Sequence, residues 1–154
     1  MPATLYLDTE FNGFGGDLIS LALFNPEGES FYEVVCGVVM DPTHVMASAV
    51  AKPFEPWVLE HVIPVLGKAP IGKKAFGEAL TAYLLRHPSP RIIADWPEDF
   101  IHLFRFLYGE KGWQLNFECR AELVMSGPLH SRIPHNAIED AKALAAWHIE
   151  AIAA

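Results

Sequence analysis

Three acidic residues and one histidine, in two short segments near opposite ends of the chain, could form a single metal site. The first segment is Asp8-Thr9-Glu10, and the second is His135-x-x-x-x-Asp140. Carboxylates that lie side by side repel one another unless cations bind between them. Carboxylate oxygens suit Mg²⁺ or Mn²⁺, and the chain has no cysteine or histidine cluster of the kind that zinc prefers. We therefore expect a divalent-cation site with a histidine available to accept a proton.

A third acidic segment, Asp95-Trp-Pro-Glu-Asp99, lies between these two. It follows a short apolar run and leads into a helical pattern. Proline is tolerated in the first turn of a helix, so Asp99 is expected within that turn and Asp95 in the lead-in, where it could cap the helix. Carboxylates at a helix start are also what the helix dipole favours, so this segment taken alone has a purely structural explanation.

The first motif is expected on a strand. Residues 4–10 form a short apolar run, and the period of two in a strand would point Asp8 and Glu10 to the same face. Residues 17–24 and 30–36 are two further predicted strands, separated by a turn-rich break that is typical of a hairpin loop. Together the three predict an antiparallel meander.

The last motif is expected at the start of a helix. Asn136-Ala-Ile-Glu139 fits a capping box, in which Asn136 caps the helix and Glu139 reaches back to it. Asp140 would then lie in the first helical turn, with His135 just outside it, so that both can share one site.

The remaining elements predict the fold class. Residues 91–94 form a short apolar run that is expected to be a strand, and residues 113–117 are expected to be the fifth strand. The predicted helices span residues 56–66, 72–86, 97–108 and 137–152. Three antiparallel strands, followed by strands that alternate with helices, predict an α/β fold with a mixed five-stranded sheet and helices on both faces.

The three acidic motifs together resemble those of the DEDDh group of 3′→5′ exonucleases, the DnaQ-like branch of the ribonuclease H-like superfamily. The motifs here are Leu7-Asp-Thr-Glu-Phe11, Ala94-Asp-Trp-Pro-Glu-Asp99 and His135-Asn-Ala-Ile-Glu-Asp140. Their order and separations suit the family over nearly the whole chain. Within the family, the chain is most similar to the small stand-alone exoribonucleases, such as ribonuclease T and ribonuclease AS. The resemblance implies a ribonuclease H-like fold.

Carried over residue by residue, the resemblance implies one general base, His135, and four metal carboxylates: Asp8, Glu10, Asp99 and Asp140. The family more often has asparagine four residues before the second-motif aspartate, where this chain has Asp95. Asp99 takes the family's aspartate position and opens the helix, so it is favoured as the metal carboxylate. Asp95 is the alternate, and otherwise would orient a water molecule or a neighbouring group.

The activity implied by the resemblance is release of nucleoside 5′-monophosphates, one by one, from a 3′ end. Two divalent ions, Mg²⁺ or Mn²⁺, about 4 Å apart would stabilise charge on the attacking and leaving oxygens of the phosphodiester. A histidine, with an unperturbed pKa of about 6.5, suits removal of a proton from the attacking water.

The expected partner is the 3′ end of single-stranded RNA or DNA. A net charge of −8 argues against a long duplex-binding surface, which needs many lysines and arginines. Phe11, Asn12, Gly13 and Phe14 follow the first motif, and could stack a terminal base while the backbone approaches it closely. Similarity to the small exoribonucleases favours RNA, although no residue can be assigned to a 2′-hydroxyl. The same similarity raises homodimerisation as an alternative to a monomer.

Length and composition predict one domain over residues 1–154. A chain that is 51% hydrophobic can bury a substantial core. Its apolar runs are shorter than the roughly 20 residues that span a bilayer, and the first strand begins too early to leave room for a signal peptide. We therefore expect no membrane association and a cytoplasmic location. The two cysteines, Cys36 and Cys119, are expected to be reduced, partly buried thiols, and Trp57, Trp96 and Trp147 are expected to pack against other residues.

Two other classes of protein share parts of this pattern. A phosphatase of the haloacid dehalogenase type also begins with a strand-borne Leu-Asp, which would make Asp8 a covalent nucleophile. However, Glu10 stands where that family has its second aspartate, and no later Gly-Asp metal motif follows. The other alternative is a non-catalytic module on the exonuclease fold that binds a nucleic-acid end or a protein, against which the intact acidic set argues.

Overall fold

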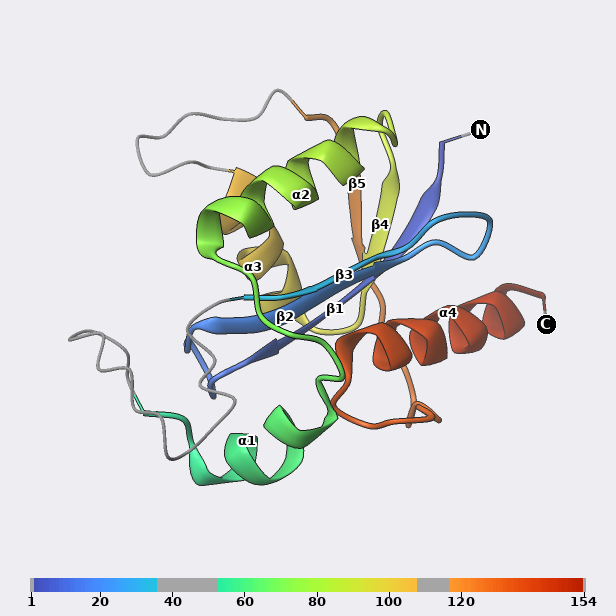
Figure 1. Ribbon diagram of the computed structural model, residues 1–154. Coiled ribbons are helices and arrows are strands. Elements are labelled where there is room, and N and C mark those ends of the chain that lie inside the picture. Colours follow the sequence, from blue (N-terminus) through green and yellow to red (C-terminus); the bar gives the residue numbers. More distant parts are fainter. Residues whose placement is uncertain (1, 36–52, 108–116, 154) are drawn as a thin grey trace.

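The computed structural model describes residues 2–35, 53–107 and 117–153, which form a mixed α/β fold around one sheet (Figure 1). The strands are β1 (Thr4–Phe11), β2 (Leu18–Phe24), β3 (Phe31–Val34), β4 (Arg91–Ala94) and β5 (Arg120–Leu123). The helices are α1 (Pro56–His61), the 3-10 helix η1 (Ile63–Val65), α2 (Lys73–Leu85), α3 (Pro97–Leu107) and α4 (Ala137–Ala153).

The five strands lie in the order β3-β2-β1-β4-β5, with the first acidic motif on the central strand. β1 pairs antiparallel with β2, and β2 antiparallel with β3, which confirms the predicted meander. β4 is parallel to both β1 and β5. Parallel strands bring their carboxyl ends to the same edge of a sheet, where ligands bind in many open α/β folds.

Helices cover both faces of the sheet, as predicted (Figure 1). On one face Leu5 and Leu7 pack with apolar residues of α2 and α3. On the other face Tyr6 packs with apolar residues of α4, including Ala141 and Leu144. This alternation along β1 follows the period of two in a strand, and it places Asp8 and Glu10 on the face that α4 covers.

Two of the predicted elements differ in the structure. The helix expected over residues 56–66 divides into α1 and η1, because Pro64 cannot donate a helical hydrogen bond and disfavours helical angles at Ile63. Of the strand predicted at 113–117, only Phe117 is among the described residues, and the fifth strand is Arg120–Leu123. Three of the four residues of β5 are exposed, so it lacks the apolar pattern by which a strand is found.

Within the described part of the chain, no helix combines the length and the apolar character that crossing a membrane requires. Cys36 lies outside the described residues, whereas Cys119 is a free, half-buried thiol as predicted.

Candidate metal centre

The acidic residues of the three motifs come together at the carboxyl ends of β1 and β4. Asp8 and Glu10 lie near the end of β1, Asp95 directly follows β4, and Asp99 and Asp140 lie in the first turns of α3 and α4. A cleft of about 390 Å³ opens there, lined by Leu129, Ser131, Pro134 and five residues whose side chains can bind protons or metal ions: Asp8, Asp95, His130, His135 and Asp140.

Two groups of side chains could each hold a metal ion. One oxygen from each of Asp8, Asp95 and Asp99 lies within 4.8 Å of the other two. The side chains of Glu10, His135 and Asp140 form a second group that meets the same limit. Asp95 and Asp99 therefore do not exclude one another, because both lie beside Asp8.

Asp99 is held from the opposite side of β1. Thr9 points to the face that carries α3, where its hydroxyl donates to Asp99 Oδ1 at 2.6 Å and its backbone N–H donates to the same oxygen at 3.2 Å. The Asp99 side chain is almost entirely buried, with 1% of the residue exposed. Among the described residues, neither Asp99 Oδ2 nor Asp8 Oδ2 has a hydrogen-bond donor, although both atoms are buried. Buried oxygens without a donor are unusual, and a cation would satisfy them.

Asp95 is held by the segment that follows β5. The Ser126 hydroxyl donates to Asp95 Oδ2 at 2.6 Å, and the other carboxylate oxygen takes no hydrogen bond from any described side chain. This arrangement suits a residue that either binds a cation itself or orients a water molecule beside one.

The pKa values of four of these carboxyl groups are raised. Burial, together with the neighbouring carboxylates, raises the pKa of Asp8 well above its usual range. Burial, Asp140 and Asp99 raise the pKa of Glu10 to about 8. Burial raises the pKa of Asp99 to about 7, although the hydrogen bond from Thr9 acts in the opposite direction. Burial also raises the pKa of Asp140. Divalent cations would favour the ionised form of every one of these groups, so the residues fit such ions.

His135 lies at the edge of this cleft in an uncommon backbone conformation. Its φ is 65°, in the left-handed region where histidine is one of the more frequent non-glycine residues. Its backbone N–H donates to Asp140 Oδ2 at 2.9 Å, which ties the loop to the first turn of α4. The indole ring of Trp57, from α1, lies against its imidazole, with 4.7 Å between the ring centres.

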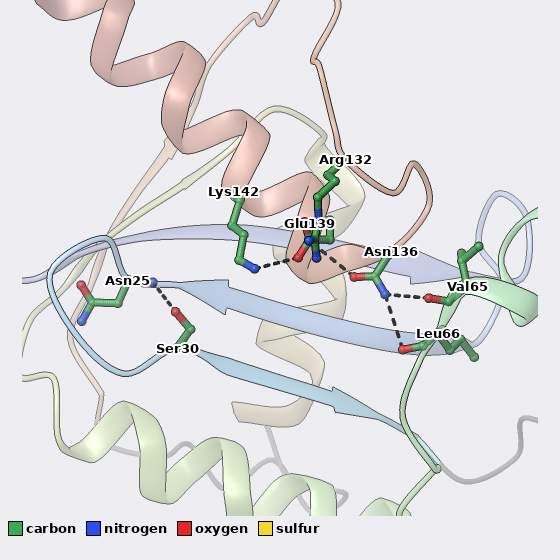
Figure 2. Close-up of polar contacts among 8 residues, drawn as sticks. All are labelled: Asn25, Ser30, Val65, Leu66, Arg132, Asn136, Glu139 and Lys142. Carbon is green, nitrogen blue, oxygen red and sulfur yellow. Dashed lines mark hydrogen bonds and ion pairs between the residues drawn. The ribbon is translucent and has the colours of Figure 1, made fainter.

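The start of α4 confirms half of the predicted capping box (Figure 2). Asn136 Oδ1 accepts from the Glu139 backbone N–H at 3.3 Å, so Asn136 is the N-cap. The reciprocal bond from Glu139 was predicted and is wrong. The Glu139 carboxylate instead accepts from Arg132 Nε at 3.0 Å and Lys142 Nζ at 2.7 Å, two charged donors that a neutral backbone N–H cannot match.

The loop after β1 uses most of its predicted substrate-binding residues for its own anchorage. The Phe11 ring packs on buried His102, with 4.8 Å between ring centres. Asn12 Nδ2 donates to the Pro53 carbonyl oxygen and its Oδ1 accepts from the Glu55 N–H, so its amide is engaged at both ends. Gly13 supplies a left-handed φ of 71° beside Glu55. Phe11 and Asn12 therefore have structural contacts within the protein, and their role in substrate binding stays a prediction.

Phe14 is the member of this loop that presents a ring to the surroundings. It is 86% exposed, and its ring centre lies 6.1 Å from that of Trp96. Trp96, which lies between Asp95 and α3, is 47% exposed and packs on Phe14. Trp57 is 51% exposed and packs on the rings of His61 and His135. An exposed aromatic pair beside an acidic site is a suitable surface for nucleobases.

The sequence reasoning missed four residues of this region. Thr9 could have been found, since a threonine between two same-face carboxylates must point to the opposite face, toward the helix after β4. Trp57, Trp96 and Ser126 carry no such signal, because their positions depend on how loops distant in sequence meet.

Searches against models of known protein families and against curated proteins give no match for this chain.

Proposed function

We propose that this protein is a metal-dependent 3′→5′ exonuclease of the DEDDh type, with a ribonuclease H-like fold and RNA as its preferred substrate. One observation carries the proposal. Five carboxylates and His135, from three motifs far apart in sequence, gather in two potential metal-binding groups at one edge of the sheet. Hydrolysis of a phosphodiester needs charge neutralisation on two oxygens and a base for the attacking water.

The likeness of the motifs and the placement of each side chain support the following roles. Glu10 and Asp140 would hold one Mg²⁺ or Mn²⁺ ion, and Asp8 with Asp99 the other. Two such ions, when bound, supply Lewis-acid stabilisation of the attacking and leaving oxygens. Asp95 would be a further ligand or would orient a water molecule, with Ser126 fixing its carboxylate. His135, at the edge of the cleft, would accept the proton of the attacking water.

The surroundings of the cleft favour a single-stranded end as substrate. Phe14 and Trp96 expose aromatic rings beside the acidic site, and stacking on such rings accepts any base. The net charge of −8 disfavours binding of a long duplex, since few lysine and arginine side chains are available to displace its counterions. RNA rather than DNA is proposed on the likeness of the three motifs to those of the small exoribonucleases.

The test is shortening of matched 5′-labelled single strands of RNA and DNA, with Mg²⁺, Mn²⁺ or EDTA. We expect stepwise loss from the 3′ end that EDTA, Asp8→Ala and His135→Ala each abolish, and faster loss from RNA. Faster loss from DNA would make the protein a DNA exonuclease. Binding without cleavage, unchanged in Asp8→Ala, would indicate a non-catalytic module. Release of inorganic phosphate from phosphomonoesters alone would favour the phosphatase alternative.

A further inference from the structure

Residues 53–66, here called the bracket segment, are hydrogen-bonded to the loop that follows the first motif and to the last motif. At one end, Asn12 donates to the Pro53 carbonyl oxygen at 3.0 Å and accepts from the Glu55 N–H at 2.8 Å. At the other end, Asn136 Nδ2 donates to the Val65 carbonyl oxygen at 2.7 Å (Figure 2). The bracket segment is therefore attached directly to the residue two positions after Glu10 and to the residue after His135.

Apolar packing fixes the bracket segment on the sheet. Val58, Val62 and Leu66 are fully or almost fully buried, and they form a separate cluster with Ile19 of β2 and Val34 of β3. With its apolar side held by the strands and both ends hydrogen-bonded, the segment is a rigid support for the residues on its other side.

Trp57 is the residue of this support that touches the proposed base. Its indole meets the His135 imidazole nearly edge to face, at an interplanar angle of 78° and 4.7 Å between centres. It also lies against His61, one turn along α1, at 4.9 Å. Edge-to-face contacts of this kind have a preferred geometry, so they orient the rings that make them.

The imidazole of His135 has one further aromatic neighbour, the ring of His61, at the longer distance of 6.4 Å between ring centres. Its backbone N–H is held by Asp140, but among residues 2–35, 53–107 and 117–153 no group is hydrogen-bonded to its ring nitrogens. A general base must hold its nitrogen within hydrogen-bond reach of the attacking water. Trp57 makes the shorter of the two aromatic contacts and also packs on His61, so among the described residues it is the neighbour best placed to set the direction of the His135 ring.

We propose that Trp57 is a positioning residue that holds the His135 imidazole toward the cleft, an inference that rests on the proposed exonuclease function. The bracket segment carries Trp57 to this position, and Asn12 serves as its anchor rather than as a substrate ligand. Trp57 acts through His135 and takes no part in the chemistry itself.

The test compares kcat and KM of Trp57→Ala and Trp57→Phe with those of the wild-type chain. Trp57→Ala is expected to lower kcat about 10- to 100-fold with KM within about twofold, because misplacement of a catalytic group costs rate rather than binding. Trp57→Phe, which keeps an aromatic edge, is expected to restore kcat to within about threefold of wild type. Leu59→Ala, at another exposed position of α1, is the matched control and should leave both constants unchanged.

The double variant Trp57→Ala/His135→Ala separates positioning from a general structural effect. If Trp57 acts through His135, the double variant is no slower than His135→Ala, since the two losses do not add. Nuclear magnetic resonance of the histidine ring protons should also show the His135 signal displaced in Trp57→Ala, with the thermal midpoint and Mn²⁺ affinity unchanged.

Several results would overturn the inference while leaving the exonuclease proposal intact. These are an unchanged kcat in Trp57→Ala, an equal loss in Leu59→Ala, a further loss in the double variant, or a rise in KM alone, which would make Trp57 a substrate contact. A wild-type chain with no nuclease activity would instead contradict the proposed function, and the positioning role would fall with it.

Discussion

Thr9 joins the first acidic motif to the second, since its hydroxyl and its backbone N–H both donate to Oδ1 of Asp99. This pairing occupies one oxygen of a buried carboxylate and leaves Oδ2 without a donor among the described residues. The middle residue of Asp-Thr-Glu thus orients a carboxylate that lies 90 residues away in the chain.

Loss of the Thr9 hydroxyl should destabilise the protein. Thr9→Val removes a hydrogen bond to a buried carboxylate that is mostly ionised above pH 7, at a cost of about 1–3 kcal/mol in the free energy of unfolding. Urea unfolding near pH 8 in EDTA measures it. Thr9→Ser keeps the hydroxyl, so its free energy of unfolding should fall much less. Equal stability of the Thr9→Val and Thr9→Ser variants would contradict a stabilising role of this hydrogen bond.

The metal-free protein should become less stable as pH rises. The pKa of Glu10 is raised from 4.5 to about 8, and that of Asp99 from 3.8 to about 7. Between the unfolded and folded values the folded chain binds more protons than the unfolded chain, so stability is greatest below the unfolded pKa values and is lost as pH rises through the folded ones.

Thermal unfolding in EDTA measures this dependence. We expect the midpoint to fall by at least about 4 °C between pH 5.5 and 9, and saturating Mg²⁺ to remove most of the fall. Glu10→Gln should reduce the dependence of the thermal midpoint on pH in EDTA. A midpoint that rises over this range in EDTA would contradict the pKa shifts.

Removal of one central carboxylate should separate stability from cation binding. Asp8→Asn relieves repulsion among the acidic groups and should stabilise the metal-free chain by on the order of 1–3 kcal/mol. The same change should abolish the stabilisation by Mg²⁺. Glu150→Gln removes an equal charge from an exposed position near the far end of α4, and should do neither. Calorimetry with and without Mg²⁺ compares the thermal stability of the two variants. Stabilisation of Asp8→Asn by Mg²⁺ equal to that of the wild-type chain would contradict a metal site at Asp8.

Asn136 should matter for both stability and catalysis. Asn136→Ala removes the N-cap of α4 and a hydrogen bond to the bracket segment, with a loss of about 1–2 kcal/mol or more. Because this disturbs the support of His135, kcat should fall as well. Asn25→Ala is the control, since Asn25 Oδ1 accepts from the Glu27 N–H in the turn between β2 and β3. Figure 2 shows Asn25 beside Ser30 in this turn, at a distance from Asn136. Asn25→Ala should lower the free energy of unfolding and leave kcat unchanged. Equal losses of kcat in the Asn25→Ala and Asn136→Ala variants would contradict a specific effect of Asn136 on His135.

Local patterns were sufficient to predict most of the fold. The period of two in residues 4–10 placed Asp8 and Glu10 on one face, and Asn136 marked the first turn of α4 correctly. Such features depend on neighbours in sequence, so they can be seen without tertiary contacts.

The features that could not be predicted depend on tertiary contacts between segments that are distant in sequence. Glu139 bonds to two cations rather than to the cap, and Asn12 bonds to the bracket segment rather than remaining free for a ligand. The short exposed strand β5 has no apolar signal, because its pairing with β4 comes from backbone groups that every sequence has. The exposed positions of Trp57 and Trp96 likewise follow from loops that only the folded chain brings together.

The most direct test of the account is the chemistry of the released product. Single-stranded RNA with a free 3′ end should be digested in ¹⁸O-labelled water with Mg²⁺, and the products analysed by mass spectrometry. The account predicts nucleoside 5′-monophosphates that carry one ¹⁸O in the phosphate, from the wild-type chain and not from Asp8→Ala. Products with 3′ or cyclic phosphates, unlabelled monophosphates, or no products from a folded wild-type protein would contradict it.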